Sequence, residues 1–339
     1  MGTQGELQGE PGIGIGERDP EGPLGPGDPL VSLAEIEADA LVLPVAIMGA
    51  PTVIVEKPPA GTEFVGAFDI VAARMGRPVT HVACLEAGGL NSMTPIVTAA
   101  RTGLPLIDGD GMGRAFPELQ MVLMTLDGIP TSPMAMADDK GNTILLDTVS
   151  NLWAERLARP ATVEMGCSAS IALYPMTGAQ ARTSMVPATI SLARDIGRLL
   201  ARTRAEHADA AEALGQAYAG RVLLRGKVTD VARRTSAGFV RGAARIAGFG
   251  SDEGATLELD FQNEHLVARR DGVVVTSVPD LICVLDADTG EPVTTESMRY
   301  GYRVAVVGLP CHDRWRTPEG LAIVGPGYFG YDHDYEPVR

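Results

Sequence analysis

The sequence predicts an α/β protein of two domains: an N-terminal α/β domain with a mainly parallel sheet, and a C-terminal β-rich domain with a long helix. From residue 31 onward, short apolar runs alternate with segments of helical periodicity, which is the pattern of βαβ units around a parallel sheet. After residue 221 the apolar runs continue, but the helical periodicity stops. The length of 339 residues suits two domains of ordinary size.

The amino-acid composition argues against several classes of partner. Apolar residues make up 45% of the chain, which is enough for a sizeable core. Acidic residues outnumber basic ones by 43 to 28, and the resulting net charge of −15 argues against binding to nucleic acid. The longest apolar run, residues 40–55, is interrupted by Pro44, Gly49 and Pro51 and is shorter than the roughly 20 residues of a membrane span. The start of the chain has no signal-peptide pattern, so we expect a cytoplasmic protein that binds neither nucleic acid nor membranes.

The first thirty residues differ in composition from the rest of the chain. Glycine and proline account for 14 of them, and they show no apolar period. Such a composition does not build a packed element. We therefore expect residues 1–30 to be irregular.

The N-terminal domain is expected to span residues 31–165. Two expected helices are each followed by a glycine, Gly76 and Gly103, which is the usual residue after a helix C-terminus. Lys140 and Gly141 lie between two apolar runs and predict a hairpin turn. The expected elements are strands at 40–47 and 52–55, a helix at 62–75, a strand at 79–85, a helix at 91–102, a strand at 104–107 and a hairpin over 134–147.

The C-terminal domain is expected to span residues 166–339. Pro187 stands at the start of a stretch with helical spacing and Gly220 stands after its end, which predicts one long helix. The residues that follow alternate between apolar runs and turn signals. The expected strands are 222–231, 257–261, 266–275 and 281–285, with short strands and turns over 301–335.

A glycine-rich loop with charged side chains follows the predicted strand 104–107 and is the strongest candidate for a functional site. Ligands of open α/β sheets bind at the carboxyl ends of the strands, and glycines let the backbone approach a ligand. Asp108 and Asp110 are candidate catalytic carboxylates, and Arg114 is a candidate clamp for a substrate carbonyl or carboxylate. The alternative is a turn in which the aspartates accept backbone N–H bonds and the arginine forms an ion pair. The loop also contains two further predicted substrate-binding residues, Gly111 and Glu118.

A second polar cluster follows the predicted strand 79–85. Glu86 is a candidate catalytic residue, because packing does not explain a carboxylate beside glycines at the end of a strand. Asn91 is a candidate substrate-binding residue, or else the N-cap of the helix after it. If the two strands run parallel, both loops lie at one edge of the sheet. We then expect one pocket to be lined by Glu86, Asn91, Asp108, Asp110 and Arg114.

Cys167 is a candidate nucleophile within a polar segment of the chain. A thiolate attacks readily when a neighbouring group lowers the pKa of the thiol. The alternative for this residue, as for Cys84, Cys283 and Cys311, is a buried structural thiol. The sequence has no CxxC pair and no HExxH pattern, so it predicts no metal centre, although carboxylates that could bind a divalent metal are abundant.

Four motifs stand out in the sequence: Glu86-Ala-Gly-Gly-Leu-Asn91, Asp108-Gly-Asp-Gly-Met-Gly-Arg-Ala-Phe-Pro-Glu118, Tyr174-Pro-Met-Thr-Gly178 and Phe261-Gln-Asn-Glu264. They resemble motifs of the S-methyl thiohydantoin desulfurase family, which is linked to hydantoinase and oxoprolinase genes. The resemblance extends from about residue 31 to the C-terminus, and the string 108–118 is its most specific part. It implies a two-domain protein that cleaves S-methyl thiohydantoin to hydantoin and methanethiol. The glycine run GTGGGG with which family members usually begin has no counterpart in residues 1–10.

The implied reaction requires water or a thiol to attack the carbon of an S-alkyl isothiourea. A carboxylate near Asp108 could deprotonate the water, or Cys167 could attack directly. We favour water, because several carboxylates surround one loop and the sequence shows no activator beside Cys167. Neither route needs a redox cofactor. The expected partners are a small cyclic ureide or thiohydantoin and further copies of this chain, and the alternative function is that of a non-catalytic accessory or binding subunit in a hydantoinase-type system.

Overall fold

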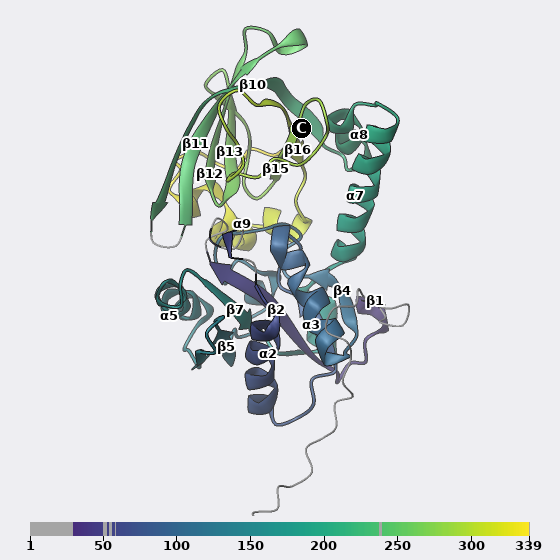
Figure 1. Ribbon diagram of the computed structural model, residues 1–339, viewed down its shortest axis with the longest axis vertical. Coiled ribbons are helices and arrows are strands. Elements are labelled where there is room, and N and C mark those ends of the chain that lie inside the picture. The colour runs from purple at the N-terminus through teal and green to yellow at the C-terminus, as the bar shows by residue number, and fades with distance from the viewer. Residues whose placement is uncertain (1–29, 50–52, 54–55, 58, 237–238, 339) are drawn as a thin grey trace, which may run out of the picture.

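The computed structural model describes residues 30–49, 53, 56–57, 59–236 and 239–338. It consists of two halves, each built around one sheet (Figure 1), which confirms the α/β fold of two domains. The expected irregular segment 1–30 and the expected strand 52–55 lie almost entirely outside the described residues.

The first sheet is mixed, with the strand order β1-β4-β3-β2-β7-β5-β6. Only the neighbouring strands β1, β4, β3 and β2 pair in parallel among the described residues, so the expected parallel arrangement holds for this part alone. The hairpin predicted over 134–147 is present and extends the other edge through antiparallel pairs. The bounds are β1 Leu30–Ser32, β2 Leu41–Gly49, β3 His81–Cys84, β4 Leu106–Asp110, β5 Met134–Ala137, β6 Thr143–Leu146 and β7 Ser168–Ala172, with β8 Met176–Thr177 beside β2 and β9 Val186–Pro187 beside β4.

Strand β2 is buried on both faces, which explains why its sequence is almost continuously apolar. Leu43 and Val45 pack on one face against helices α2 (Thr62–Met75) and α3 (Thr94–Thr102). Ala46 and Met48 face the opposite side, where helix α5 (Asn151–Glu164) packs. The shorter helices of this half are α4 Leu123–Leu126 and α6 Gly178–Ser184, with 3₁₀ turns at Leu33–Glu35 and Gly89–Ser92.

The second sheet is antiparallel throughout, in the order β14-β13-β12-β11-β10-β16-β15. The sheet curls, and β13, near one end of this order, also contacts β15 at the other end. The bounds are β10 Arg221–Ser236, β11 Phe239–Gly248, β12 Thr256–Gln262, β13 Glu264–Arg270, β14 Val273–Ser277, β15 Leu281–Asp286 and β16 Arg303–Leu309. Strand β11 is a long element that the sequence prediction missed.

The prediction of a single long helix over 187–219 is wrong. The structure has two helices there, α7 (Thr189–Ala205) and α8 (Ala210–Ala217). His207 has a φ of +52°, which breaks the helix, and the side chain of Asp209 then caps α8 by accepting a hydrogen bond from the Glu212 amide. Both helices pack on β16 and its neighbours through a separate apolar cluster.

The C-terminal part of the chain returns to the first half. Its elements are 3₁₀ turns at Asp313–Arg316 and Pro326–Phe329 and the helix α9 (Pro318–Val324). Trp315 is fully buried, and its indole N–H donates to the carbonyl of Met112 at 2.7 Å. The boundary predicted after residue 165 stays a prediction, although β7, β8 and β9 all belong to the first sheet.

Candidate functional site

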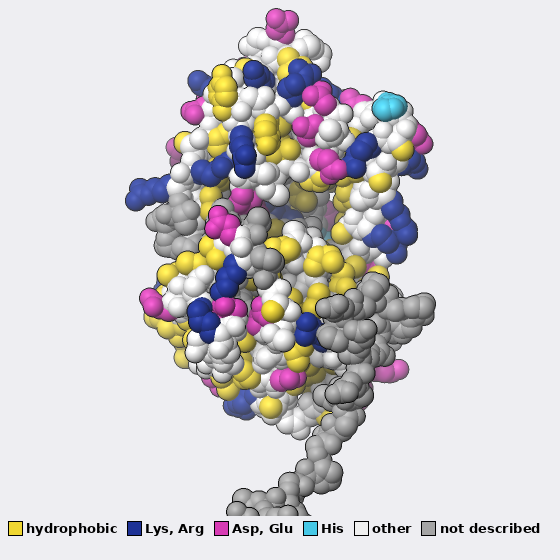
Figure 2. All heavy atoms as spheres, in the orientation of Figure 1, with side chains coloured by type: hydrophobic (Ala, Val, Ile, Leu, Met, Phe, Trp, Pro, Cys, Tyr) yellow, Lys and Arg dark blue, Asp and Glu magenta, His cyan; other side chains and the backbone are white. Residues whose placement is uncertain are grey.

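A cavity of about 890 Å³ lies between the two halves, and Figure 2 shows the surface hollowed at this level. The first half contributes the end of β2 and the loops after β3 and β4. The second half contributes the start of β13, strand β15 and the segment 292–299. The cavity is therefore formed by both domains, at the carboxyl edge of the parallel strands.

Glu86 lines the cavity directly after β3, as the sequence predicted. Asn91 Nδ2 donates a hydrogen bond of 2.5 Å to Glu86 Oε1, and the Asn91 side chain also bonds to both the amide and the carbonyl of Ile47. Asn91 is therefore not the N-cap of α3, whose N-cap is Met93. Burial raises the pKa of Glu86 to about 7 against the opposing effect of the Asn91 hydrogen bond, and the charge of Asp110 raises it further.

Glu264 lines the cavity from the second half and was not among the predicted site residues. It follows a tight turn between β12 and β13 in which Asn263 has a φ of +56°. The amide and Oδ1 of Asn263 both bond to Val240 at 2.8 Å, and its carbonyl accepts from the Thr295 hydroxyl at 2.6 Å. Three hydrogen bonds thus hold this turn in place.

Burial raises the pKa of Glu264 to about 8, the charge of Glu86 raises it further, and Arg114 opposes both effects. Glu264 Oε2 is buried and has no hydrogen-bond partner among the described residues. The two carboxyl groups are therefore electrostatically coupled across the cavity, and they come from different domains. Such a pair can hold one proton near neutral pH, which is the arrangement that general acid–base chemistry requires.

Arg114 also lines the cavity, where its guanidinium is bonded to backbone carbonyls of the second half. Its Nη1 donates to the carbonyls of Pro279 and Asp280 at 2.8 and 2.6 Å, and its Nη2 donates to the carbonyl of His265 at 3.3 Å. The guanidinium also lies 4.7 Å from the ring centroid of Phe116. Most of its donors are used in holding the second domain, so Arg114 contributes mainly a fixed positive charge to the cavity wall.

Asp110 is completely buried and does not line the cavity. Its carboxylate accepts hydrogen bonds from the amides of Ala87, Gly113 and Met112 at 2.6, 2.7 and 3.2 Å. Burial raises its pKa to about 6 despite these bonds. Asp110 thus joins the loop after β4 to the loop after β3. This is the alternative in which the aspartates of the loop accept backbone N–H bonds.

Gly111 does not line the cavity either. Its amide donates to the carbonyl of Leu85, and a Cβ at this position would lie 3.0 Å from that oxygen. The glycine is thus needed for close approach of two backbones rather than for contact with a substrate. Glu118 does line the cavity, where it accepts hydrogen bonds from Gln120 Nε2 at 2.5 Å and from the Tyr328 hydroxyl at 2.6 Å.

Asp108 lies outside the cavity at the start of α7. Its carboxylate accepts from the amides of Ile190 and Ser191 at 3.1 and 3.0 Å and from the Ser191 hydroxyl at 2.6 Å. Asp108, which belongs to β4, therefore caps helix α7. The first N–H groups of a helix have no partner within it, and the Asp108 carboxylate accepts hydrogen bonds from two of them.

Replacing Asp108 by Ala is expected to lower the free energy of unfolding by about 1–2 kcal/mol, because two amides at the start of α7 lose their acceptor. Asp108→Asn keeps one acceptor oxygen and should cost less. Urea unfolding, monitored by circular dichroism, measures the stability of both variants. Equal stability of the wild type and the Ala variant would contradict this capping role.

Cys167 does not line the cavity. It has a φ of +65° on the loop between α5 and β7, two residues after Met165, whose carbonyl accepts a hydrogen bond from Lys140 Nζ at 3.3 Å. Cys283 is the cysteine that lines the cavity, but it also packs against the apolar cluster under α7 and α8, and burial raises its pKa to about 11. The raised pKa of Cys283 disfavours its thiolate, and Cys167 lies away from the cavity.

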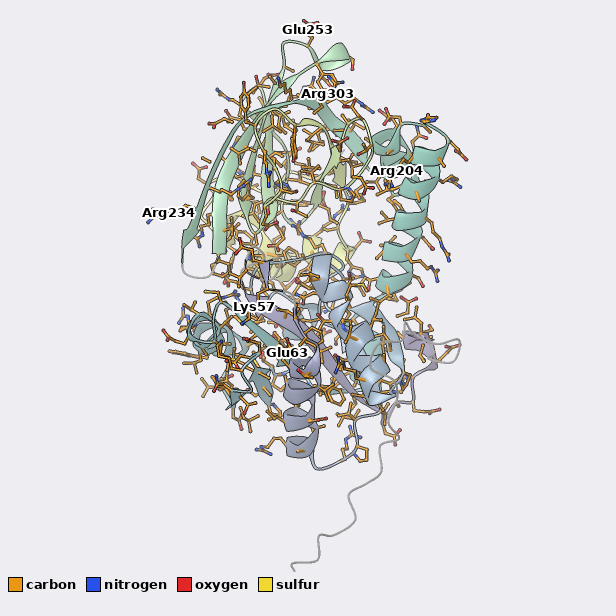
Figure 3. All side chains as sticks on the ribbon, viewed as in Figure 1. Lys57, Glu63, Arg204, Arg234, Glu253 and Arg303 are labelled. Atoms are coloured by element: carbon orange, nitrogen blue, oxygen red, sulfur yellow. The ribbon has the colours of Figure 1, made fainter. Side chains whose placement is uncertain are left out.

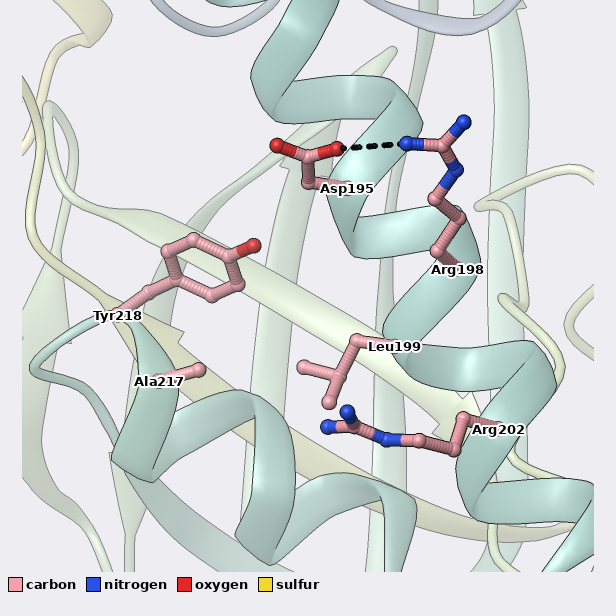
Figure 4. A pocket seen from close by; sticks show the side chains of 6 residues that line it. All are labelled: Asp195, Arg198, Leu199, Arg202, Ala217 and Tyr218. Carbon is pink, nitrogen blue, oxygen red and sulfur yellow. Dashed lines mark ion pairs between the residues drawn. The ribbon is translucent and has the colours of Figure 1, made fainter.

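Several charged side chains outside the cavity are directed to solvent. Arg234, Glu253 and Arg303 lie at the surface of the second half (Figure 3). A second, shallower pocket of about 380 Å³ lies between α7 and α8 (Figure 4), where Arg198 pairs with Asp195 at 3.6 Å. It contains none of the predicted site residues, so the cavity between the domains is the candidate site.

Among the described residues, no three His, Cys, Asp or Glu side chains are grouped so that they could hold a metal ion. In that same part of the chain, no helix combines the length and the apolar character needed to cross a membrane.

Comparisons with known proteins agree with this architecture. Residues 25–148 match the model of the S-Me-THD-like N-terminal domain, and residues 149–338 match that of the S-Me-THD-like C-terminal domain. The crystal structure of a protein from Chromobacterium violaceum has the same fold, with a TM-score of 0.75 and 24% sequence identity over 89% of this chain and 85% of that chain. A search of curated proteins gave no match. Because the two domain models together cover all of the described residues, the chain belongs to the S-Me-THD-like family, that of the S-methyl thiohydantoin desulfurases.

Proposed function

We propose that this protein hydrolyses the C–S bond of an S-methyl thiohydantoin to give hydantoin and methanethiol. Membership of the S-Me-THD-like family supports the substrate class. The observation that carries the proposed chemistry is the coupled pair Glu86 and Glu264, which line one cavity from its two halves and whose pKa values are raised to about 7 and about 8.

In the proposed reaction Glu86 begins ionised and Glu264 begins protonated. Water attacks the ring carbon that bears sulfur, Glu86 takes a proton from the water, and the C=N nitrogen receives the proton of Glu264. In the second step the new hydroxyl returns its proton to Glu264 as the C=O bond forms. The C–S bond breaks, and Glu86 gives its proton to the departing sulfur. Both carboxyl groups end as they began, and the reaction consumes one water.

The surrounding residues keep this pair in place. Asn91 orients Glu86 through the 2.5 Å hydrogen bond to Oε1. Arg114 adds a positive charge near Glu264, and Arg159 adds one near Glu86. Both favour negative charge that develops on the substrate. Water attack also accommodates the position of Cys167 outside the cavity.

The direct test is release of methanethiol. The purified chain is incubated with S-methyl thiohydantoin, the thiol is measured with a chromogenic disulfide, and hydantoin is measured by chromatography. We expect the two products in equal amounts, and Cys167→Ser should release thiol at the wild-type rate. Binding of hydantoin without any thiol release would instead favour the accessory-subunit alternative, and a mass-spectrometric adduct on a cysteine would contradict attack by water.

A further inference from the structure

His265 is a buried residue of the cavity wall whose hydrogen-bonding groups are unused. Its side chain is 7% exposed and lines the cavity from β13, immediately after Glu264. Neither Nδ1 nor Nε2 has a hydrogen-bond partner among the described residues. A buried polar atom left unpaired destabilises the folded protein, so two such atoms on one ring indicate that something else satisfies them when the site is filled.

The position of the ring is fixed by the fold rather than by its own polar atoms. His265 packs edge-to-face against Phe261 with 6.0 Å between the ring centroids. Its carbonyl accepts a hydrogen bond from Arg114 Nη2, which links this strand to the loop after β4. The imidazole is therefore held in place, and neither of its nitrogens is hydrogen-bonded within the described residues.

The charge state of the ring follows from its surroundings. Burial and the nearby cation of Arg114 lower the pKa of His265 to about 4, so the imidazole is neutral at physiological pH. A neutral imidazole has one N–H donor and one nitrogen acceptor. The donor can bond a carbonyl group and the acceptor can bond an N–H group. A ring that contains an amide carries both of these groups.

We propose that His265 is a ligand-binding residue that hydrogen-bonds the amide groups of the cyclic ureide, and so selects rings that carry C=O and N–H groups. This inference rests on the proposed function for the identity of the ring. It adds a residue that neither the sequence motifs nor the reaction scheme requires, because the proton transfers above use Glu86 and Glu264 alone.

The experiment measures binding of hydantoin, the proposed product, by calorimetry. His265→Phe keeps a ring of similar shape but has no polar atoms, and should bind hydantoin about tenfold more weakly or worse. His265→Asn and His265→Gln place an amide near the positions of the two ring nitrogens in turn, and one of them should stay within a few-fold of the wild type. The matched control is His81→Phe, because His81 is partly buried at the start of β3 and bonds Thr80 outside the cavity; it should bind normally.

A measurement on the wild type covers the case in which a variant fails to fold. Hydantoin should shift the ring-nitrogen resonances of His265 in a nitrogen-15 NMR spectrum, with assignment from the His265→Gln spectrum. Wild-type affinity in the Phe variant, or ring resonances that saturating hydantoin does not move, overturns the proposal. Methanethiol release is measured separately, so that loss of His265-dependent binding and absence of catalysis are distinguishable results.

Discussion

Replacing Glu264 by Gln is expected to lower kcat/KM for S-methyl thiohydantoin by about 10²–10⁴-fold, the usual contribution of a positioned acid or base. The amide keeps the shape of the side chain but has no proton to give to the ring nitrogen. Folding should be retained, because Glu264 Oε2 has no hydrogen-bond partner among the described residues that would be lost. Glu86→Gln should have an effect of similar size, because the amide does not take a proton from water.

The pH dependence follows from the same pair. Glu86 acts ionised, so kcat/KM should rise as the pH increases through about 7, and Glu264 acts protonated, so kcat/KM should fall above about 8. The pair titrates as a unit, and the profile reports its two macroscopic pKa values. A bell-shaped profile near pH 7–8 in the wild type, without its alkaline limb in Glu264→Gln, supports these assignments. A profile that is identical in both proteins contradicts them.

Replacing Arg114 by Met is expected to destabilise the protein by about 3 kcal/mol or more. The change leaves the carbonyls of Pro279 and Asp280 without the charged donor that bonds them, and each unpaired buried acceptor costs about 1–3 kcal/mol. Arg114→Lys should recover only part of this loss, because one ammonium does not reproduce the geometry of a planar guanidinium. Unfolding in guanidinium chloride measures the stability of the wild type, Arg114→Met and Arg114→Lys.

The matched control for Arg114 is Arg234→Met. Arg234 is exposed on β10 and points away from the molecule (Figure 3), so its removal should change stability by less than about 0.5 kcal/mol. If Arg114→Met unfolds at the wild-type denaturant concentration, the guanidinium does not hold the domains together as described.

The pattern of the sequence was sufficient to place two loops at one edge of the sheet. Parallel strands end on the same side, so Glu86 and the loop after Asp108 had to be neighbours once β3 and β4 were parallel. The direction of each side chain could not be predicted in this way. Asp110 turns toward three backbone amides and Asp108 toward the start of α7, and both contacts depend on how the loop folds over its neighbours.

Glu264 was missed because the prediction treated residues 262–265 as a turn between two strands. Its role in the site depends on a contact with a wall formed almost 180 residues earlier in the chain, and local periodicity carries no information about such a contact. One signal was available in the sequence. The polar residues Gln262, Asn263 and Glu264 stand inside a motif shared with the family, although packing alone would favour a simple turn there.

The hydrogen bonds of Arg114 also set the order in which the protein matures during synthesis. Arg114 lies 165 positions before the first of the two carbonyls that bond its Nη1. At a translation rate of about 5–20 residues per second, the ribosome needs roughly 10–30 seconds to make the intervening chain. Strands β5 to β9 are made within that interval, so the first sheet can be completed before the carbonyls that bond Arg114 have been synthesised.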